Sequence, residues 1–215
     1  MKYRLLVFDW DGTIIDSAAT IAECIRDASR ALGLDVPDRE RASHVIGLGL
    51  HDAMRIAVPG LPAQRYPEFV ASYREHFLAR KDSMQLFDGM RQLLEGLSKT
   101  RLLAIATGKS RRGLDRDLDF HNLQPLFAAS RCADETNPKP HPAMLRELME
   151  ELAVENDSSL MIGDTSHDLE MARAAGVDGL AVAYGAHPEH ELRSCAPRAC
   201  VASVAALALW LSENG

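Results

Sequence analysis

The sequence of 215 residues lacks any apolar run long enough to cross a bilayer, which takes about 20 consecutive apolar residues. Its first residues, Met1 to Arg4, lead at once into a short apolar stretch that ends in an acidic cluster. Neither the length nor the flanking residues of this stretch are those of a secretion signal. We therefore expect a cytoplasmic protein without a membrane partner.

Cysteine is also scarce, with four in the whole sequence. Cys195 and Cys200 are the nearest pair, but their spacing is not that of a structural zinc site, and Cys24 and Cys132 stand alone. Reduced thiols are the simpler expectation. We expect folding to need neither a disulfide nor a structural metal.

An excess of basic residues is missing, because the formal net charge is -7. Proteins that bind the phosphate backbone of nucleic acids usually carry a concentrated basic face, so we expect no nucleic-acid partner. The one local basic cluster, Lys109, Arg111 and Arg112, is short, and we interpret it as the solvated start of a helix. With 47% hydrophobic residues, the chain can form a normal core, and we expect a monomer or a weak homodimer.

Short apolar segments, each followed by a polar loop, alternate with helical patterns along most of the chain. The predicted strands are residues 4–8, 102–106, 159–162 and 179–183, and the predicted helices are residues 90–99, 111–120, 142–152 and 166–175. This alternation predicts an α/β fold with a Rossmann-like, doubly wound parallel sheet. Ligands in such folds bind at the carboxyl ends of the strands, so the four polar loops should meet at one edge.

One stretch breaks the alternation, because residues 17–83 carry apolar residues at helical spacing throughout. The predicted helices here are residues 18–32, 38–44, 51–57 and 63–78. We expect a small all-helical cap domain, residues 17–83, inserted after the first strand. Residues 1–16 and 84–215 would then form the catalytic core.

Two carboxylates, Asp9 and Asp11, directly follow the first predicted strand. Two like charges about 4 Å apart repel by roughly 4 kcal/mol at an effective dielectric constant of 20, so such a pair needs a cation, a shared proton or separation. The alternative is an acidic turn that caps a helix, which is a common use of aspartate.

A third carboxylate, Asp164, follows a later strand and should reach the same edge of the sheet. Three acids would require a cation, and oxygen ligands of this hard type suit Mg²⁺. Asp168 either extends this site or caps the helix that begins near Ser166, and the sequence leaves both interpretations open.

Two further polar groups lie in predicted loops. Thr107 precedes Gly108, and its hydroxyl and the next backbone N–H groups could hold a phosphoryl oxygen at a helix start. Lys139 lies between prolines, which fix the local backbone and can aim its ammonium at one point. The alternative for Lys139 is an exposed lysine on a stiff loop.

Taken in order, these motifs resemble those of the haloacid dehalogenase-like superfamily over nearly the whole chain. Asp9 and Asp11 match its first motif, Thr107 its second, Lys139 its third, and Asp164 with Asp168 its fourth. The helical insert is similar to the cap of subclass I, which includes phosphoglycolate phosphatases. Asp11 disfavours the dehalogenases themselves, which lack an acid at that position.

The resemblance implies a Mg²⁺-dependent phosphoric monoester hydrolase acting on a small phosphorylated metabolite, with phosphoglycolate as the leading substrate. Asp9 would become phosphorylated, Asp11 would act as acid and base, and Thr107 and Lys139 would offset charge. Metal ligands would come from Asp9, Asp164 and the backbone carbonyl of Asp11, with Asp168 ligating the metal or orienting its waters. The phosphate would also contact Gly12 of the first motif and Gly108 of the second. Gly47 and Leu48 would contact it from a cap loop that resembles the specificity loop of related enzymes.

Other functions stay open at this stage. A phosphomutase of the β-phosphoglucomutase type, or a pyrophosphatase or nucleotidase, would use the same motifs. A receiver-like signalling module also combines aspartates, a threonine and a lysine around Mg²⁺, although its lack of a helical insert disfavours it. A non-catalytic phosphate-binding protein is disfavoured because every catalytic position is occupied.

Overall fold

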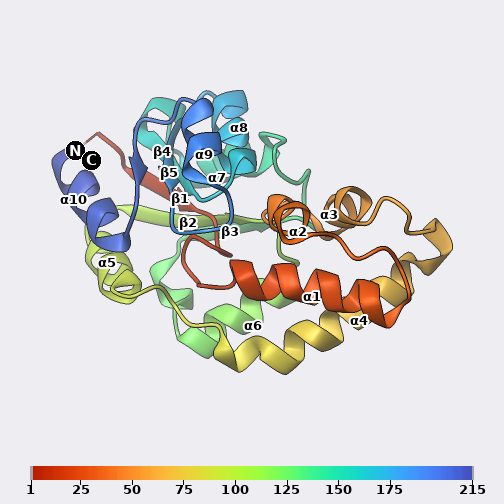
Figure 1. The fold of residues 1–215 in the computed structure, drawn as a ribbon. Coiled ribbons are helices and arrows are strands. Elements are labelled where there is room, and N and C mark those ends of the chain that lie inside the picture. The colour runs from red at the N-terminus through yellow and green to blue at the C-terminus, as the bar shows by residue number, and fades with distance from the viewer. Residues whose placement is uncertain (1, 215) are drawn as a thin grey trace.

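A parallel β-sheet forms the centre of the computed structural model, which describes residues 2–214 (Figure 1). The strand order is β3-β2-β1-β4-β5-β6. The strands are β1 (Leu5–Phe8), β2 (Leu102–Thr107), β3 (Ala129–Cys132), β4 (Ser159–Gly163), β5 (Asp178–Val182) and β6 (Cys200–Val201). The order reverses beside β1, and the carboxyl ends of β1 and its neighbours therefore border a crevice. This topology confirms the predicted Rossmann-like α/β fold.

Both faces of the sheet are buried, as continuous apolar strands predict. Leu5 and Val7 point to one face, where α7 (Ala143–Leu152) and α8 (Ser166–Ala175) pack, and Leu6 and Phe8 point to the other. That second face is covered by α5 (Met90–Leu97), α6 (Arg111–His121) and α10 (Val204–Asn214). The short α9 (Glu189–Ser194) packs beside α8 and β6. The alternation of side chains along β1 thus anchors two helical layers.

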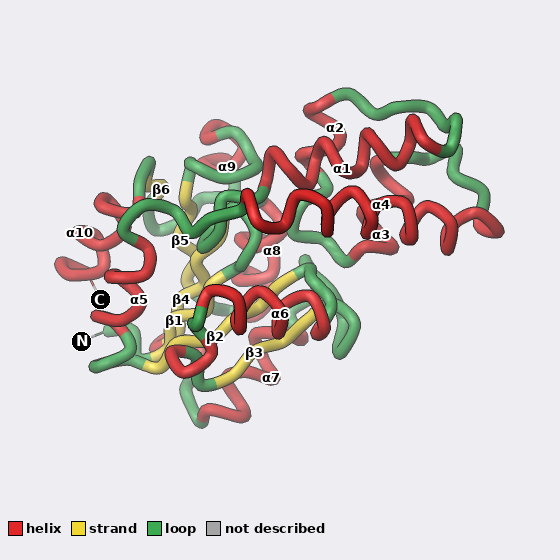
Figure 2. Tube along the Cα trace, turned by 90° about the horizontal axis from the view of Figure 1, so that it is seen from below, coloured by secondary structure: helices red, strands yellow, loops and turns green. Residues whose placement is uncertain are grey.

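Residues 17–83 lie beyond one end of the sheet, in the helices α1 (Ala18–Ala31), α2 (Arg39–His44), α3 (Leu50–Ala57) and α4 (Tyr66–Arg80) (Figures 1 and 2). Short 3₁₀ turns, Ala63–Arg65 and Lys81–Ser83, flank α4, which packs along α1. The chain enters and leaves this part at adjacent points, because the Asp16 N–H donates to the Gln85 carbonyl at 2.8 Å. The Phe87 N–H donates likewise to the Ile14 carbonyl at 3.2 Å.

The sequence patterns found most elements but not all of them. Helices α7 and α8 coincide closely with the predicted ranges, whereas β3, β6, α9 and α10 were not predicted. β3 has Ser130 and Arg131 at its centre and lies at the edge of the sheet, so it lacks the apolar run that marks the central strands. β6 has only two residues, which is too short for any periodicity.

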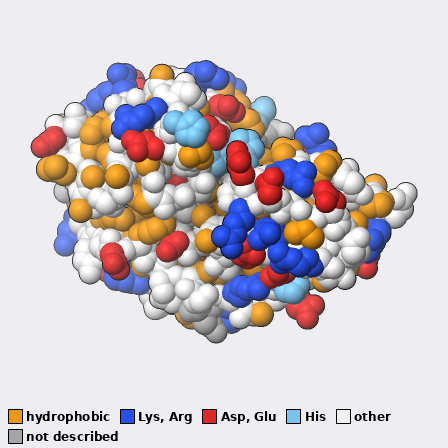
Figure 3. All heavy atoms as spheres, viewed as in Figure 1, with side chains coloured by type: hydrophobic (Ala, Val, Ile, Leu, Met, Phe, Trp, Pro, Cys, Tyr) orange, Lys and Arg blue, Asp and Glu red, His pale blue; other side chains and the backbone are white. Residues whose placement is uncertain are grey.

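The surface mixes charges of both signs. On the face shown in Figure 3, Lys and Arg side chains gather over α1 next to Asp and Glu side chains. On this helix, Arg26 pairs with Glu23 at 2.8 Å, and Asp27 pairs with Arg80 of α4 at 2.5 Å. Within residues 2–214, no helix combines the length and the apolarity that a membrane span requires.

Candidate active site

Three carboxylates and one lysine meet at the carboxyl ends of β1 and β4. Asp9 directly follows β1, Asp164 directly follows β4, Asp168 lies in the first turn of α8, and Lys139 comes from the loop before α7. The Lys139 Nζ lies 2.7 Å from Asp9 Oδ1 and 2.6 Å from Asp168 Oδ1. None of the four residues is more than 1% exposed. The structure therefore brings together residues that are up to 159 positions apart in the sequence.

The acidic group has the ligand chemistry of a hard divalent cation. Asp9, Asp164 and Asp168 each offer a carboxylate oxygen, and these atoms lie within 4.8 Å of one another. Asp9 Oδ2 is buried and has no hydrogen-bond partner among residues 2–214. One lysine leaves three buried carboxylates with excess negative charge, which is costly unless a further cation offsets it. Oxygen donors of this kind fit Mg²⁺.

The pKa values report the same shortage of positive charge. Burial raises the pKa of Asp9 well above its usual value; Lys139 opposes the shift, and the other two carboxylates add to it. Burial and the charge of Asp168 raise the pKa of Asp164 to about 7. Burial would lower the pKa of Lys139, but the carboxylates of Asp168 and Asp9 outweigh it and raise this pKa.

Hydrogen bonds hold the remaining oxygens of the group in place. Asp164 Oδ1 accepts from the Thr13 hydroxyl, and Asp164 Oδ2 accepts from the Ala186 N–H, both at 2.7 Å. Asp168 Oδ2 accepts from the backbone N–H of Thr165 at 3.1 Å and from its hydroxyl at 2.7 Å. The Thr165 hydroxyl accepts in turn from the Asp168 N–H at 3.4 Å, which completes a capping box at the start of α8. Asp168 therefore caps the helix, as one of the two interpretations predicted, while its Oδ1 still faces the acidic group.

The carboxylate of Asp11 lies apart from this acidic group. Its Oδ1 accepts from the Ser17 hydroxyl at 2.7 Å, and both of its oxygens lie 3.1 Å from Lys109 Nζ. Ser17 stands directly before α1, so the Asp11 side chain contacts the point where the chain enters the helical segment. The paired acids of the first motif are thus separated, each with its own lysine.

Lys109 corrects one of the interpretations of the sequence. We took it for part of a solvated helix start, but its side chain is only 9% exposed. Its ammonium also lies 3.0 Å from Asp117 Oδ2 on α6 and 4.9 Å from the ring centroid of Phe77 on α4. Burial would lower the pKa of Lys109, but the carboxylates of Asp11 and Asp117 outweigh it and raise the pKa.

The loop between α2 and α3 lies directly over the acids and the second motif. A Cβ on Gly108 would come within 2.5 Å of the carbonyl oxygens of Gly47 and Leu48, so only glycine permits this contact. Gly47 itself has φ +89°, and a Cβ there would lie 3.7 Å from Asp9 Oδ2. Thr107, which is 1% exposed, accepts at its hydroxyl from the Lys109 N–H at 3.2 Å. The predicted cap loop and phosphate loop are therefore in contact.

Gly12 lies equally close to the acidic group. Its φ is +81°, and a Cβ there would lie 2.2 Å from Asp164 Oδ2. Any other residue at this position would have to displace the Asp164 carboxylate and adopt a left-handed backbone. The first motif therefore packs tightly against the fourth.

Comparison with known proteins identifies the family. The model of the haloacid dehalogenase-like hydrolases matches residues 6–182. The chain belongs to this family. A 5′-nucleotidase of Pseudomonas aeruginosa is 32% identical over 220 residues, which cover 100% of this chain and 98% of that protein. The tyrosine-protein kinase PtkA of Mycobacterium tuberculosis is 31% identical over 185 residues, which cover 85% of this chain but 62% of that kinase.

The fold of this haloacid dehalogenase-like chain also has close counterparts among solved structures. One is a predicted phosphoglycolate phosphatase from Haemophilus somnus, with a TM-score of 0.88 at 21% identity over 99% of both chains. The family match confirms the predicted superfamily.

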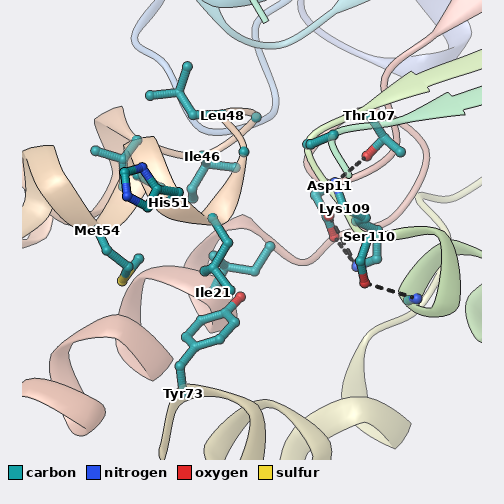
Figure 4. Close-up of a pocket in the computed structure, with 18 of the residues that line it drawn as sticks. Asp11, Ile21, Ile46, Leu48, His51, Met54, Tyr73, Thr107, Lys109 and Ser110 are labelled. Carbon is teal, nitrogen blue, oxygen red and sulfur yellow. Dashed lines mark hydrogen bonds and ion pairs between the residues drawn. The ribbon is translucent and has the colours of Figure 1, made fainter. Parts of the chain in front are cut away.

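A cavity of about 920 Å³ opens from the hydrolase motifs toward the helical segment. Figure 4 shows Thr107, Asp11 and Lys109 on one side of it. Side chains of the helical segment line the rest, including Ile21, Ile46, Leu48, His51, Met54 and Tyr73. The polar end could hold a phosphate, and the mostly apolar end could hold the group to which that phosphate is attached.

Sequence reasoning missed several residues that shape this site. Thr13 and Ser17 flank the first motif, and their short spacing from Asp11 was the available signal. Asp117 and Phe77 carried no such signal, because each looks like an ordinary helical residue until α6 and α4 come together around Lys109.

Proposed function

We propose that the protein is a Mg²⁺-dependent phosphatase that hydrolyses a small phosphate monoester through an aspartyl-phosphate on Asp9. One observation carries this proposal: a fully buried, unpartnered carboxylate oxygen of Asp9 lies at a strand end, beside Lys139 and two further carboxylates. A carboxylate oxygen held this way has a free lone pair for attack, and the ammonium of Lys139 beside it offers positive charge to an incoming phosphate.

The residues can divide the reaction as follows. A carboxylate oxygen of Asp9 attacks phosphorus, the bond from phosphorus to the ester oxygen breaks, and Asp11 gives a proton to that oxygen. Water then attacks phosphorus and Asp11 takes its proton. The bond between the Asp9 oxygen and phosphorus breaks, which restores the Asp9 carboxylate and releases inorganic phosphate. Asp9, Asp164, Asp168 and the backbone carbonyl of Asp11 would hold Mg²⁺, which when bound supplies positive charge to the phosphoryl oxygens.

Phosphate binding is assigned to the groups around the polar end of the cavity. These are Gly12, Thr107, Gly108, Lys139 and the loop residues Gly47 and Leu48. Residues 17–83 would form a cap domain that moves on the paired junctions at Asp16 and Gln85 and excludes water when closed. The contact of Gly108 with the Gly47 carbonyl supports a closed arrangement of this loop.

Two substrate classes have support. Phosphoglycolate is favoured by the resemblance to phosphoglycolate phosphatases that the motifs and the fold both indicate. A nucleoside monophosphate is favoured by the cavity of about 920 Å³, which is at the upper end of the roughly 300–1,000 Å³ of small-molecule sites, and by the full-length similarity to a 5′-nucleotidase. The cavity is larger than a two-carbon acid needs.

A panel of phosphorylated metabolites, assayed for phosphate release with Mg²⁺ and with EDTA, tests the proposal. We expect multiple turnovers with Mg²⁺, none with EDTA, and none for Asp9→Asn. Asp157→Asn is the matched control and should keep wild-type activity, because Asp157 is exposed and lies at the amino end of β4, opposite the site. Turnover by Asp9→Asn equal to that of the wild type would refute the proposed nucleophile.

A further inference from the structure

Lys109 is a buried cation that has no role in the proposed reaction as described so far. It follows Thr107 and Gly108 in the second motif, and its side chain lies beside Asp11 at the edge of the cavity (Figure 4). The other buried lysine, Lys139, contacts Asp9 and Asp168 and leaves Asp11 to Lys109. The two acids of the first motif are therefore served by two separate ammonium groups.

The contacts of Asp11 fix the direction of its carboxylate. Ser17 donates to Oδ1 only, whereas Lys109 reaches both oxygens at 3.1 Å. A bidentate contact of this kind defines the plane of the carboxylate as well as its position. Without Lys109, the Ser17 hydroxyl would be the one remaining side-chain donor to Asp11 within residues 2–214. A single hydrogen bond to Oδ1 would not fix the plane of the carboxylate.

Lys109 is itself held from two other elements. Asp117 of α6 binds the ammonium at 3.0 Å, and Arg116 binds the other Asp117 oxygen at 2.9 Å. The ring of Phe77 on α4 covers the ammonium at 4.9 Å. Asp117 thus gives Lys109 a second anionic partner on α6, and Phe77 makes the arrangement depend on the position of α4.

We propose that Lys109 is the positioning residue that aims Asp11 at the ester oxygen, and that Asp117 and Phe77 hold it in place from α6 and α4. The proposal rests on the proposed phosphatase function and on Asp11 as its acid and base. Lys109 does not touch the reacting atoms; it acts through the carboxylate that does.

The test compares esters that differ in their need for a proton. The p-nitrophenolate ion leaves without protonation, whereas the alcohol of an alkyl phosphate needs a general acid. We expect Lys109→Met to lower kcat on the alkyl phosphate by about 10- to 100-fold, part of the 10²–10⁴ range of general acid catalysis, and on p-nitrophenyl phosphate by less than about threefold. Lys109→Arg should recover part of the loss, and Lys99→Met, at an exposed lysine, should change neither ester.

Two further variants keep the test decisive. Asp117→Asn retains the lysine and removes its outer partner, so it should show the same preference between esters with a smaller loss, even if Lys109→Met folds poorly. In an Asp11→Asn background, Lys109→Met should cause little further loss on the alkyl phosphate, because both act on one step.

The outcomes separate this inference from the function on which it rests. Equal losses on both esters for Lys109→Met and Asp117→Asn, while Asp11→Asn still discriminates between them, would overturn the positioning role alone. The positioning role would also be overturned if the loss of kcat in the double variant equalled the product of the losses in Asp11→Asn and Lys109→Met. If the wild type hydrolyses neither ester nor any other phosphate monoester with Mg²⁺, the function and the inference both fail.

Discussion

Replacing Lys139 by methionine tests whether the acidic group is held together electrostatically. The change removes the cation that contacts both Asp9 and Asp168 at 2.6–2.7 Å and keeps a side chain of similar length. At an effective dielectric constant of 20, one such contact is worth about 6 kcal/mol before desolvation is subtracted. Breaking a buried pair by removing one partner typically costs about 3–5 kcal/mol, and we expect a loss in that range without metal.

Urea unfolding in EDTA at neutral pH measures this loss. Lys2→Met is the matched control, because Lys2 pairs with Asp178 at the same 2.7 Å but is 49% exposed. An exposed pair contributes about 0–1 kcal/mol, so the control should unfold almost as the wild type does. Adding Mg²⁺ should restore part of the stability of Lys139→Met, because the ion supplies positive charge to the same carboxylates. A loss of less than about 1 kcal/mol for Lys139→Met, equal to that of the control, would refute the reasoning.

Three further predictions concern the metal, the backbone and acid stability. Mg²⁺ at 100 times its dissociation constant should raise the unfolding free energy of the wild type by about 2.7 kcal/mol, and calorimetry should show no such gain for Asp164→Asn. Gly12→Ala should lose about 1–3 kcal/mol and nearly all activity, because its Cβ would meet Asp164 Oδ2 at 2.2 Å, whereas Gly96→Ala in α5 has open space and should gain about 0.5–1 kcal/mol in urea unfolding. Burial would raise the pKa of Asp178, but hydrogen bonds from two basic side chains and a tyrosine hold it at about 2, below the value of about 4 in the unfolded chain. Its stabilisation is therefore present above about pH 4 and lost as the pH falls toward 2, and acid titrations of unfolding should show a shallower fall for Asp178→Asn.

The sequence was sufficient for the centre of the fold and for the acids at its edge. Asp9 and Asp164 each directly follow a fully buried and mostly apolar strand, so the position of the strand fixes the position of the acid. These are local signals, and the parallel sheet brings them together without further information. The prolines around Lys139 predict only a fixed loop, and it was the resemblance of the motifs to those of the family that placed this lysine at the site.

The environment of Lys109 could not be predicted in the same way. Its burial depends on Asp117 and Phe77, which reach it from helices whose packing is set by the tertiary structure. The edge strand β3 and the two-residue β6 were missed for a related reason, because pairing with a neighbouring strand, and not their own composition, makes them strands. Local patterns report what a segment prefers, and these features depend on what surrounds it.

Trapping the phosphorylated enzyme tests the central claim most directly. The wild type would be mixed with a phosphate monoester and Mg²⁺, quenched in acid within one turnover and reduced with borohydride, which converts an aspartyl-phosphate to homoserine. Mass spectrometry of the peptides should then find homoserine at position 9 and nowhere else. Phosphate release at the normal rate with an unmodified Asp9, or with the label on another residue, would contradict the account.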